Sequence, residues 1–236
     1  MNRIFNFRLS LLFLLFLASP GIHAQEKIDS LLPVRGLCID APAPAAVDSF
    51  VTFIDQAMAP QGINLLVLQV DYHYQFKSHP ELTDTLALSR EDAKKIVAAC
   101  RKNNIRIIPQ INLLGHQSWA NKTGMLLKKY PQFDETPWIA MPAVYHWPNA
   151  DSLYCKSYCP LYPGLHKVVF DVMDELLDVF EASAFHAGMD EVFFIGEDKC
   201  PRCAHHDRSE LFANEVKTLR DHLAERNKTL WIWGDR

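Results

Sequence analysis

Two adjacent carboxylates, Asp190 and Glu191, are the side chains of this sequence best suited to acid–base chemistry. They follow the apolar segment AFHAGM. Because successive side chains of a strand point in opposite directions, one carboxylate would point into the mouth of the fold and the other along its rim. A carboxyl group that is buried or beside another anion keeps its proton to higher pH, so it can act as an acid near neutrality. The alternative is an ordinary Asp-Glu pair at a strand end, which is favoured when the pair is taken alone.

Short apolar strands that alternate with amphipathic helices must position this pair. Turn residues bound each strand, as is typical of parallel strands buried on both faces. The predicted strands are 36–40, 65–71, 106–112, 184–190 and 230–235. Apolar residues at helical spacing predict helices over 47–58, 165–180 and 211–223. Ser89 is predicted to cap a further helix, with acidic residues in its first turn and basic residues in its last.

Repeated strand–helix units predict a parallel sheet, either a (β/α) barrel or a doubly wound sheet. The chain contains neither G-x-G-x-x-G after the first strand nor G-x-x-x-x-G-K-[ST], which weakens the nucleotide-binding folds. A polar residue closes each strand: Asp40, Asp71, Asn112, Asp190 and Asp235. One such residue could simply start a turn, but a barrel enzyme gathers its functional groups at these strand ends. We therefore predict an α/β fold, a TIM (β/α)8-type barrel with about five of its eight units present.

A long insert, 113–164, follows the third strand and is rich in aromatic residues. A segment of this length without regular structure is usually functional. We expect most of its aromatic side chains to pack the insert onto the barrel and a few to contact a ligand.

The N-terminus, residues 1–24, is predicted to be a secretory signal peptide with cleavage near Ala24. Arg3 and Arg8 supply positive charge ahead of the apolar run 9–18, which is shorter than the ~20 residues of a comfortable membrane span. Residues 25–33 form a leader and 34–236 the barrel domain. The expected location is secreted or periplasmic, with no membrane association after cleavage.

Composition and charge favour a globular chain over a nucleic-acid-binding one. The 236 residues are 49% hydrophobic and carry a net charge of −4, so no basic face for nucleic acid is expected.

The pair lies in a set of motifs that resembles a known family. Residues 185–192 (FHAGMDEV) resemble the H-x-G-G-D-E-V motif of family 20 glycoside hydrolases, the β-N-acetylhexosaminidases. The segment 34–40 (VRGLCID) resembles that family's first strand, and 105–116 (IRIIPQINLLGH) its third strand and following turn. Residues 231–235 (WIWGD) resemble its fifth-strand W-x-D, and 200–203 (CPRC) a CPxC of bacterial relatives. The similarity runs in the family's order from residue 33 to 236.

The resemblance implies hydrolysis of terminal β-linked N-acetylhexosamine residues, a glycan partner and no cofactor. Glu191 would be the general acid/base, and Asp190 would orient the substrate's 2-acetamido group, which attacks the anomeric carbon in this family. The substrate-binding residues would be Asp71, His116, His186, Trp233 and Asp235. For His186, a buried strand histidine with no direct role is an equally open alternative.

Several positions depart from the family pattern. Ala43 stands where the family has an arginine that binds sugar hydroxyls, and Gln110 and Asn112 replace two carboxylates. Tyr72 follows Asp71 where a second aspartate is typical. These differences keep a second hypothesis open, a non-catalytic carbohydrate-binding protein on a degenerate barrel. A complete barrel needs ~250 residues, so we also expect a C-terminally incomplete barrel that catalyses inefficiently by itself.

Six cysteines fall into two groups. Cys38 and Cys100 are predicted to be small buried residues. The other four suit either a structural zinc site, with His205 and His206 as reserve ligands, or two disulfides: Cys155, Cys159, Cys200 and Cys203. A metal-dependent hydrolase that uses these ligands is a third, weaker hypothesis.

Overall fold

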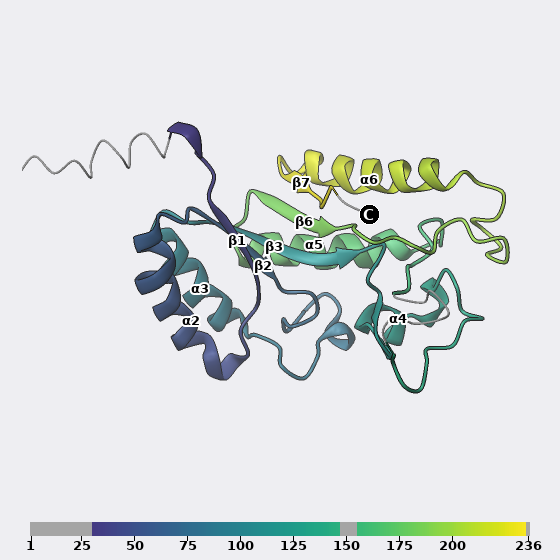
Figure 1. Cartoon of the computed structure of the whole chain (residues 1–236), viewed down its shortest axis with the longest axis horizontal. Helices are drawn as coiled ribbons and strands as arrows, with labels where there is room; N and C mark the ends of the chain where they lie inside the picture. The colour runs from purple at the N-terminus through teal and green to yellow at the C-terminus, as the bar shows by residue number, and fades with distance from the viewer. Residues whose placement is uncertain (1–29, 147–154, 235–236) are drawn as a thin grey trace, which may run out of the picture. The chain divides into compact units, whose positions relative to one another are not determined.

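The computed structural model describes residues 30–146 and 155–234 (Figure 1). Contacts divide the chain into residues 1–35 and 36–236, and the fold described below is that of the second unit. The predictions for residues 1–24 and for Asp235 lie outside the described residues.

A five-stranded parallel sheet with the order β1-β2-β3-β6-β7 is the centre of this unit (Figure 1). Its strands are β1 (Gly36–Asp40), β2 (Leu65–Gln69), β3 (Arg106–Leu113), β6 (Ala184–Gly188) and β7 (Thr229–Trp231). Strands β1, β2 and β3 pair without a register shift, with Gly36 opposite Leu65 and Leu65 opposite Arg106. This confirms the predicted parallel α/β sheet. In the described part of the chain β1 and β7 remain edge strands, so the sheet is open there.

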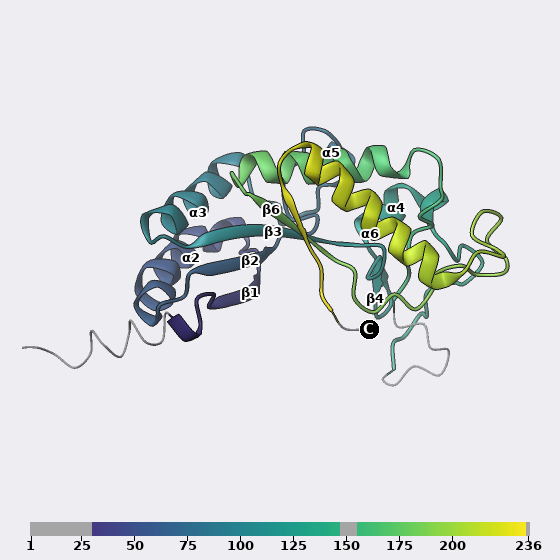
Figure 2. The ribbon, with the colours of Figure 1, turned by 90° about the horizontal axis from the view of Figure 1, so that it is seen from above.

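Helices join the strands and cover one face of the sheet. They are α2 (Val47–Phe53), which continues in π-helical turns to Met58, α3 (Arg90–Lys102), α5 (Leu165–Val179) and α6 (Arg208–Glu225). Figure 2 shows α3, α5 and α6 following one another along one side of the sheet. Contacts agree, since α3 packs on β3, α5 on β3 and β6, and α6 on β7. Each helix in the described ranges is too short or too polar to cross a lipid bilayer.

Local sequence explains where these helices begin. The Ser89 hydroxyl accepts a hydrogen bond from the Asp92 backbone N–H at 3.1 Å, while the Asp92 carboxylate accepts one from the Ser89 N–H, as predicted for this cap. Asp207 caps α6 by accepting from the backbone N–H groups of Ser209 and Glu210. Such caps satisfy orphan donors and contribute about 1 kcal/mol each.

The two faces of the sheet carry apolar clusters of different size. The main core lies between sheet and helices and includes Leu66, Leu68 and Ile107. On the opposite, inner face a small cluster joins Leu65 to Ile108 and Ala184. Cys38 is exposed because it lies on the inner face of the edge strand β1, so its predicted burial was wrong. Cys100 is buried in α3, as predicted.

Strands β2 and β6 end two residues earlier than predicted. The φ angles of Asp71 (43°), Gly188 (65°) and Met189 (67°) are positive, which takes the backbone out of extended geometry. Strand β7 also ends early, at Trp231, but the Trp233 N–H still donates to the Gly188 carbonyl at 2.9 Å.

The insert after β3 contains more regular structure than predicted. It holds a short hairpin, β4 (Ser118–Trp119) with β5 (Lys122–Thr123), then α4 (Met125–Lys129) and a 3₁₀ turn at Pro131–Phe133. Further 3₁₀ turns elsewhere span Pro44–Ala46, Ala59–Gln61 and Pro80–Leu82. Phe133 and Tyr158 are buried, whereas the Trp119 side chain is exposed, so some aromatic residues of the insert pack against the fold and the predicted contact of others with a ligand stays a prediction.

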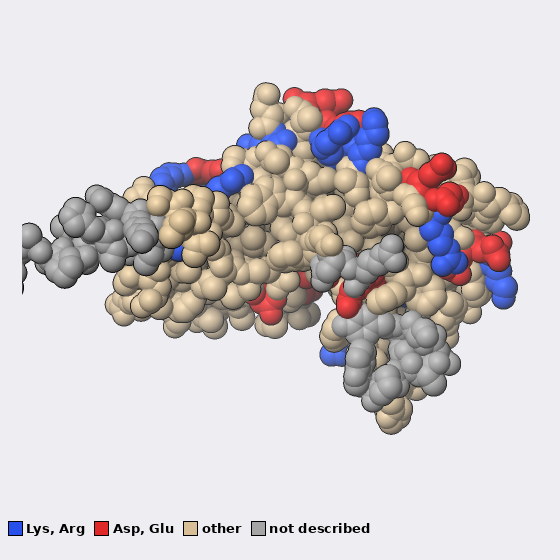
Figure 3. Space-filling model, turned by 45° about the horizontal axis from the view of Figure 1, so that its top comes forward, with Lys and Arg blue, Asp and Glu red and all other residues tan. Residues whose placement is uncertain are grey.

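Charges on the face drawn in Figure 3 stand in small mixed groups, with Lys and Arg beside Asp and Glu. On α6, for example, Lys217 pairs with Asp221 at 2.6 Å. Exposed pairs of this kind contribute about 0.2–1 kcal/mol, so packing of the sheet against its helices dominates the stability.

Candidate active site

A cavity of about 700 Å³ opens at the carboxyl ends of the strands. Its lining comes from the carboxyl ends of all five strands of the sheet and from the start of the insert: Asp40, Gln69, Asp71, Asn112, His116, Ser118, Trp119, Asp190, Glu191 and Trp233. Five residues predicted for the site, Asp71, His116, Asp190, Glu191 and Trp233, thus meet here. The sequence reasoning missed Gln69 and Ser118; the two-residue alternation of β2 could have indicated Gln69, since Asp71 lies two positions further on.

His116 links the two carboxylates of the pair. Its Nε2 donates to Asp190 Oδ2 at 3.2 Å and lies 3.4 Å from Glu191 Oε2. The other Asp190 oxygen, Oδ1, is buried and receives no hydrogen bond from a described residue. The Glu191 side chain is 31% exposed and the Asp190 side chain 21%, so Glu191 is the more accessible to a ligand.

The histidine and Asp190 stabilise each other's charged form. Burial alone would raise the pKa of Asp190, but the hydrogen bond and the charge of His116 hold that pKa below its usual value. Burial likewise opposes protonation of His116, yet its hydrogen bonds to Asp190 and Cys155 raise the pKa of His116 to about 10. At neutral pH the site therefore contains an aspartate anion beside a histidinium cation.

Strained backbone is concentrated at these residues. Met189 and Glu191 on either side of Asp190 have φ angles of 67° and 49°, and His116 has 52°. Each such residue costs about 1–2 kcal/mol relative to ordinary geometry. Surrounding contacts hold the strain in place, as is typical of functional sites. Gly115 lets the His116 turn approach the pair, because a Cβ there would lie 2.8 Å from the Asp190 carbonyl oxygen.

Gly188 is the glycine on which the site geometry depends most. Its φ is +65°, and a Cβ there would lie 2.3 Å from Asn112 Oδ1. Gly188→Ala is therefore expected to destabilise the chain by about 2–4 kcal/mol, from the left-handed backbone and the collision together. The measurement is the free energy of unfolding from urea titration.

Gly164→Ala is the matched control for this prediction. Gly164 also has a left-handed φ, +86°, but a Cβ there would meet nothing within 4 Å. Its expected loss is about 1–2 kcal/mol, from the backbone alone. Equal losses in the two variants would show that contact with Asn112 is unimportant.

Asn112 is held by hydrogen bonds from neighbouring elements. Its backbone N–H donates to Asp71 Oδ1 at 2.8 Å, and its Oδ1 accepts from Gln110 Nε2 at 3.1 Å. Burial raises the pKa of Asp71, against the lowering effect of that hydrogen bond. The register of β3 and β6 shifts between Gln110 and Leu113, and such irregularities often re-aim side chains beside active sites. The two amides that depart from the family pattern therefore form a connected network.

His186 does not line the cavity, which corrects its prediction as a substrate-binding residue. It is 1% exposed, and its Nδ1 accepts a hydrogen bond from the Gly188 N–H at 3.1 Å. Burial lowers the pKa of His186 to about 4, so the ring is neutral. Its ring centroid lies 4.3 Å from that of Trp233, so His186 supports the Trp233 side of the cavity from beneath.

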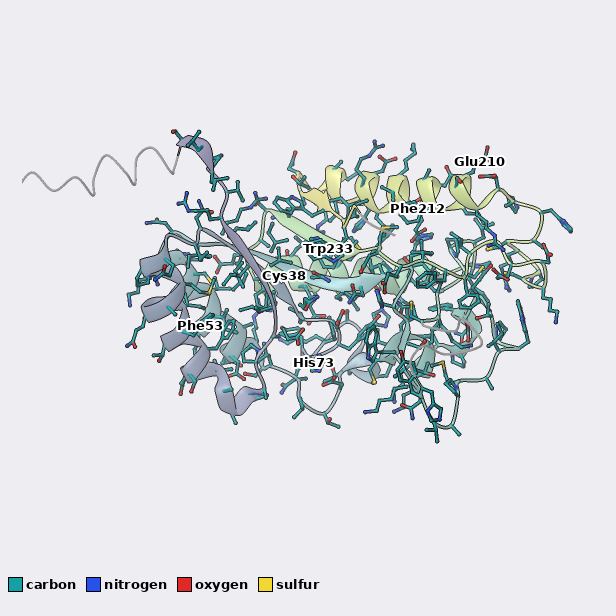
Figure 4. The ribbon with its side chains drawn as sticks, viewed as in Figure 1. Cys38, Phe53, His73, Glu210, Phe212 and Trp233 are labelled. Atoms are coloured by element: carbon teal, nitrogen blue, oxygen red, sulfur yellow. The ribbon has the colours of Figure 1, made fainter. Side chains whose placement is uncertain are left out.

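A second, more apolar cavity of about 780 Å³ adjoins the first and shares Glu191 and Trp233 with it. Phe212 from α6 and Trp233 from the segment after β7, both labelled in Figure 4, contribute to its lining. Glu191 thus stands between a polar and an apolar space.

The four cysteines predicted to gather do not form one cluster. Cys159, Cys200 and Cys203 lie together with Glu135. Cys155 lies instead beside the Asp190–Glu191 pair, where its thiol donates to the Glu191 carbonyl oxygen at 3.4 Å. The predicted set was therefore wrong in one member, because Cys155 contacts the backbone of Glu191 instead of the other three cysteines.

Comparisons with known proteins agree with this geometry. Residues 33–236 match the profile of glycosyl hydrolase family 20, catalytic domain. A β-hexosaminidase of Akkermansia muciniphila is 30% identical over 115 residues, which are 49% of this chain and 21% of that protein. The β-N-acetylhexosaminidase of Bacteroides fragilis superposes with a TM-score of 0.65 at 18% identity, over 85% of this chain and 42% of that one.

A third relative carries a bound sugar. The exo-β-N-acetylglucosaminidase of Vibrio harveyi, solved in complex with N-acetylglucosamine, has a TM-score of 0.61 at 17% identity, over 85% of this chain and 35% of that one. This chain spans less than half the length of each of these three relatives. The structural neighbours confirm the predicted barrel-type fold, of which the described residues form an open part. The order of the motifs and the profile match together show that the chain belongs to glycosyl hydrolase family 20.

Proposed function

We propose that this chain carries the site of a β-N-acetylhexosaminidase, which removes terminal N-acetylhexosamine from a glycan with the help of the substrate's own acetamido group. The observation that carries the proposal is the placement of Asp190 and Glu191 in one cavity, bridged by His116. Family membership supports hydrolysis, and the N-acetylglucosamine bound to the Vibrio harveyi neighbour supports the sugar.

The two carboxylates are suited to different roles because their surroundings differ. Asp190 is ionised because the hydrogen bond and the charge of His116 hold its pKa below the usual value. The anion would stabilise the positive charge that develops when the acetamido oxygen attacks the anomeric carbon. Glu191 is more exposed and would protonate the leaving glycosidic oxygen, then deprotonate the incoming water.

Other residues of the cavity would hold the sugar. Trp119 and Trp233 offer aromatic faces, and Asp40, Asp71 and Gln69 offer acceptors and an amide from neighbouring strands. Ala43, at the family's arginine position, supplies no charge for the sugar hydroxyls, so recognition rests on these polar groups.

A substrate pair tests the proposal. The chain is expected to hydrolyse a chromogenic N-acetyl-β-glucosaminide and to leave the matching β-glucoside intact, because the glucoside lacks the attacking acetamido group. Comparable turnover of both substrates would contradict the substrate-assisted mechanism. Saturable binding of N-acetylglucosamine without turnover would favour the carbohydrate-binding alternative and overturn the proposal.

A further inference from the structure

A buried cluster of four metal-ligating side chains lies outside the catalytic cavity. Glu135, Cys159, Cys200 and Cys203 each offer one ligand atom, and these atoms all lie within 4.8 Å of one another. The Sγ atoms of Cys159 and Cys203 are 3.2 Å apart, and those of Cys159 and Cys200 are 3.6 Å apart. In a tetrahedral site with Zn–S bonds of about 2.3 Å, sulfur atoms stand about 3.8 Å apart. Small outward movements of the thiols would therefore admit a zinc ion.

The local backbone at Cys200–Cys203 favours a thiolate ligand. The Cys203 N–H donates to the Cys200 sulfur at 3.5 Å, a charge-assisted bond when that sulfur is ionised. The same turn is closed by the Cys200 N–H donating to the Glu197 carbonyl at 2.8 Å. Moreover, a disulfide joins two cysteines, so a disulfide within this cluster of three would leave the third as a buried free thiol. The Cys-x-x-Cys turn thus places the sulfur atoms of Cys200 and Cys203 close enough to bind the same metal ion.

Glu135 provides an independent indication of a cation. Its side chain is fully buried, and its Oε1 accepts a hydrogen bond from the Glu197 N–H at 3.0 Å. Its Oε2 is buried and receives no hydrogen bond from any described residue. A carboxylate oxygen without a partner is costly in the protein interior. The neighbouring Asp134, by contrast, is paired with Lys156 at 2.5 Å. A metal ion between Glu135 and the three sulfurs would remove this cost.

We propose that Glu135, Cys159, Cys200 and Cys203 bind one structural Zn²⁺ ion. Soft thiolates with one carboxylate form a donor set that Zn²⁺ accepts and that Mg²⁺ or Ca²⁺ disfavours. Four protein ligands close the tetrahedron, so the ion has no open position and is structural. It ties the insert, which supplies Glu135 and Cys159, to the segment after β6, which contains Glu191 and supplies both other cysteines. This site stands on the fold alone and does not depend on the proposed hydrolase activity.

Metal content of the purified full chain is the first test. We expect about one zinc ion per chain in the wild type and close to none in Cys203→Ser. Glu135→Gln is expected to weaken zinc binding by at least about tenfold. Loss of a residue that only hydrogen-bonds to a metal ligand already lowers metal affinity by about 10–100-fold, and Glu135 is proposed to bind the metal directly. Cys155→Ser is the matched control, because Cys155 lies at Glu191 rather than in the cluster. Loss of zinc in Cys155→Ser, or its retention in Cys203→Ser, would overturn the assignment.

Wild-type protein provides a test that does not require a variant to fold. After removal of zinc by a chelator in the presence of reductant, added Co²⁺ is expected to bind and to give the thiolate-to-metal charge-transfer and tetrahedral ligand-field absorption of a three-thiolate site. After denaturation with chelator but without reductant, all six cysteines should be alkylated. Two fewer alkylated cysteines would show a disulfide, and failure of reduced protein to bind Co²⁺ or Zn²⁺ would show no site; either result overturns the proposal.

Discussion

Glu191→Gln is expected to lower kcat for an alkyl N-acetyl-β-glucosaminide by about 10²–10⁴-fold, the usual contribution of a general acid. The amide keeps the shape of the side chain but has no proton of suitable acidity to give to the leaving oxygen. A nitrophenyl leaving group departs with little help, so the loss for that substrate is expected to be smaller. The difference between the two losses is the signature of a missing proton donor.

Glu210→Gln is the matched control, because Glu210 is an exposed glutamate in the first turn of α6 and outside both cavities (Figure 4). It is expected to retain the wild-type kcat on both substrates. Equal losses for the two leaving groups in Glu191→Gln would contradict the role of Glu191 as the acid, and an unchanged rate would remove it from the reaction altogether.

Asp190→Asn is expected to lower kcat by about 10²–10³-fold, because it removes an anion aimed at charge that develops in the transition state. Since this charge develops on the acetamido group rather than on the leaving oxygen, the loss is expected to be similar for both leaving groups. Parallel kinetics of Asp190→Asn and Glu191→Gln on both substrates therefore separate the two roles. A leaving-group dependence like that of Glu191→Gln would contradict the role of Asp190.

The same substitution has a consequence for the pH dependence of stability. The pKa of His116 is about 10 in the folded chain, against about 6.5 for a free histidine. Stability from this shift is fully present below the unfolded pKa and is lost as pH rises through the folded pKa. In Asp190→Asn the pKa of His116 falls, so urea midpoints at about pH 6 and about pH 9 should differ less than in the wild type. An identical difference in both proteins would show that Asp190 does not hold the proton on His116.

Local signals in the sequence were sufficient for the elements. Apolar runs bounded by turn residues located all five strands of the sheet, and Ser89 with Asp92 located the start of α3. The polar residues at the ends of these strands also indicated the site, because parallel strands bring their carboxyl ends to one edge. Asp71, His116, Asp190, Glu191 and Trp233 meet there for that reason.

Residues whose surroundings come from distant segments could not be predicted in this way. Cys38 was expected in the core, but exposure on an edge strand depends on which strand lies beside it. His186 was expected at the sugar, but the alternation of β6 and the ring of Trp233 place it beneath the cavity. Gln69 and Ser118 carry no motif and enter the site through strand register and a hairpin.

The sequence alone determined the α/β class, the sheet's strands and the candidate catalytic pair, because periodicity, turn residues and adjacent carboxylates are local properties of a chain. The tertiary structure decided which side chains share a space. It placed Cys155 against Glu191 and brought Glu135 to Cys159, Cys200 and Cys203 across the boundary between the insert and the segment after β6. Metal ligands and the residues that line a cavity come from segments far apart in sequence. Their proximity depends on how these segments pack together, and the spacing of residues within one segment does not reveal it.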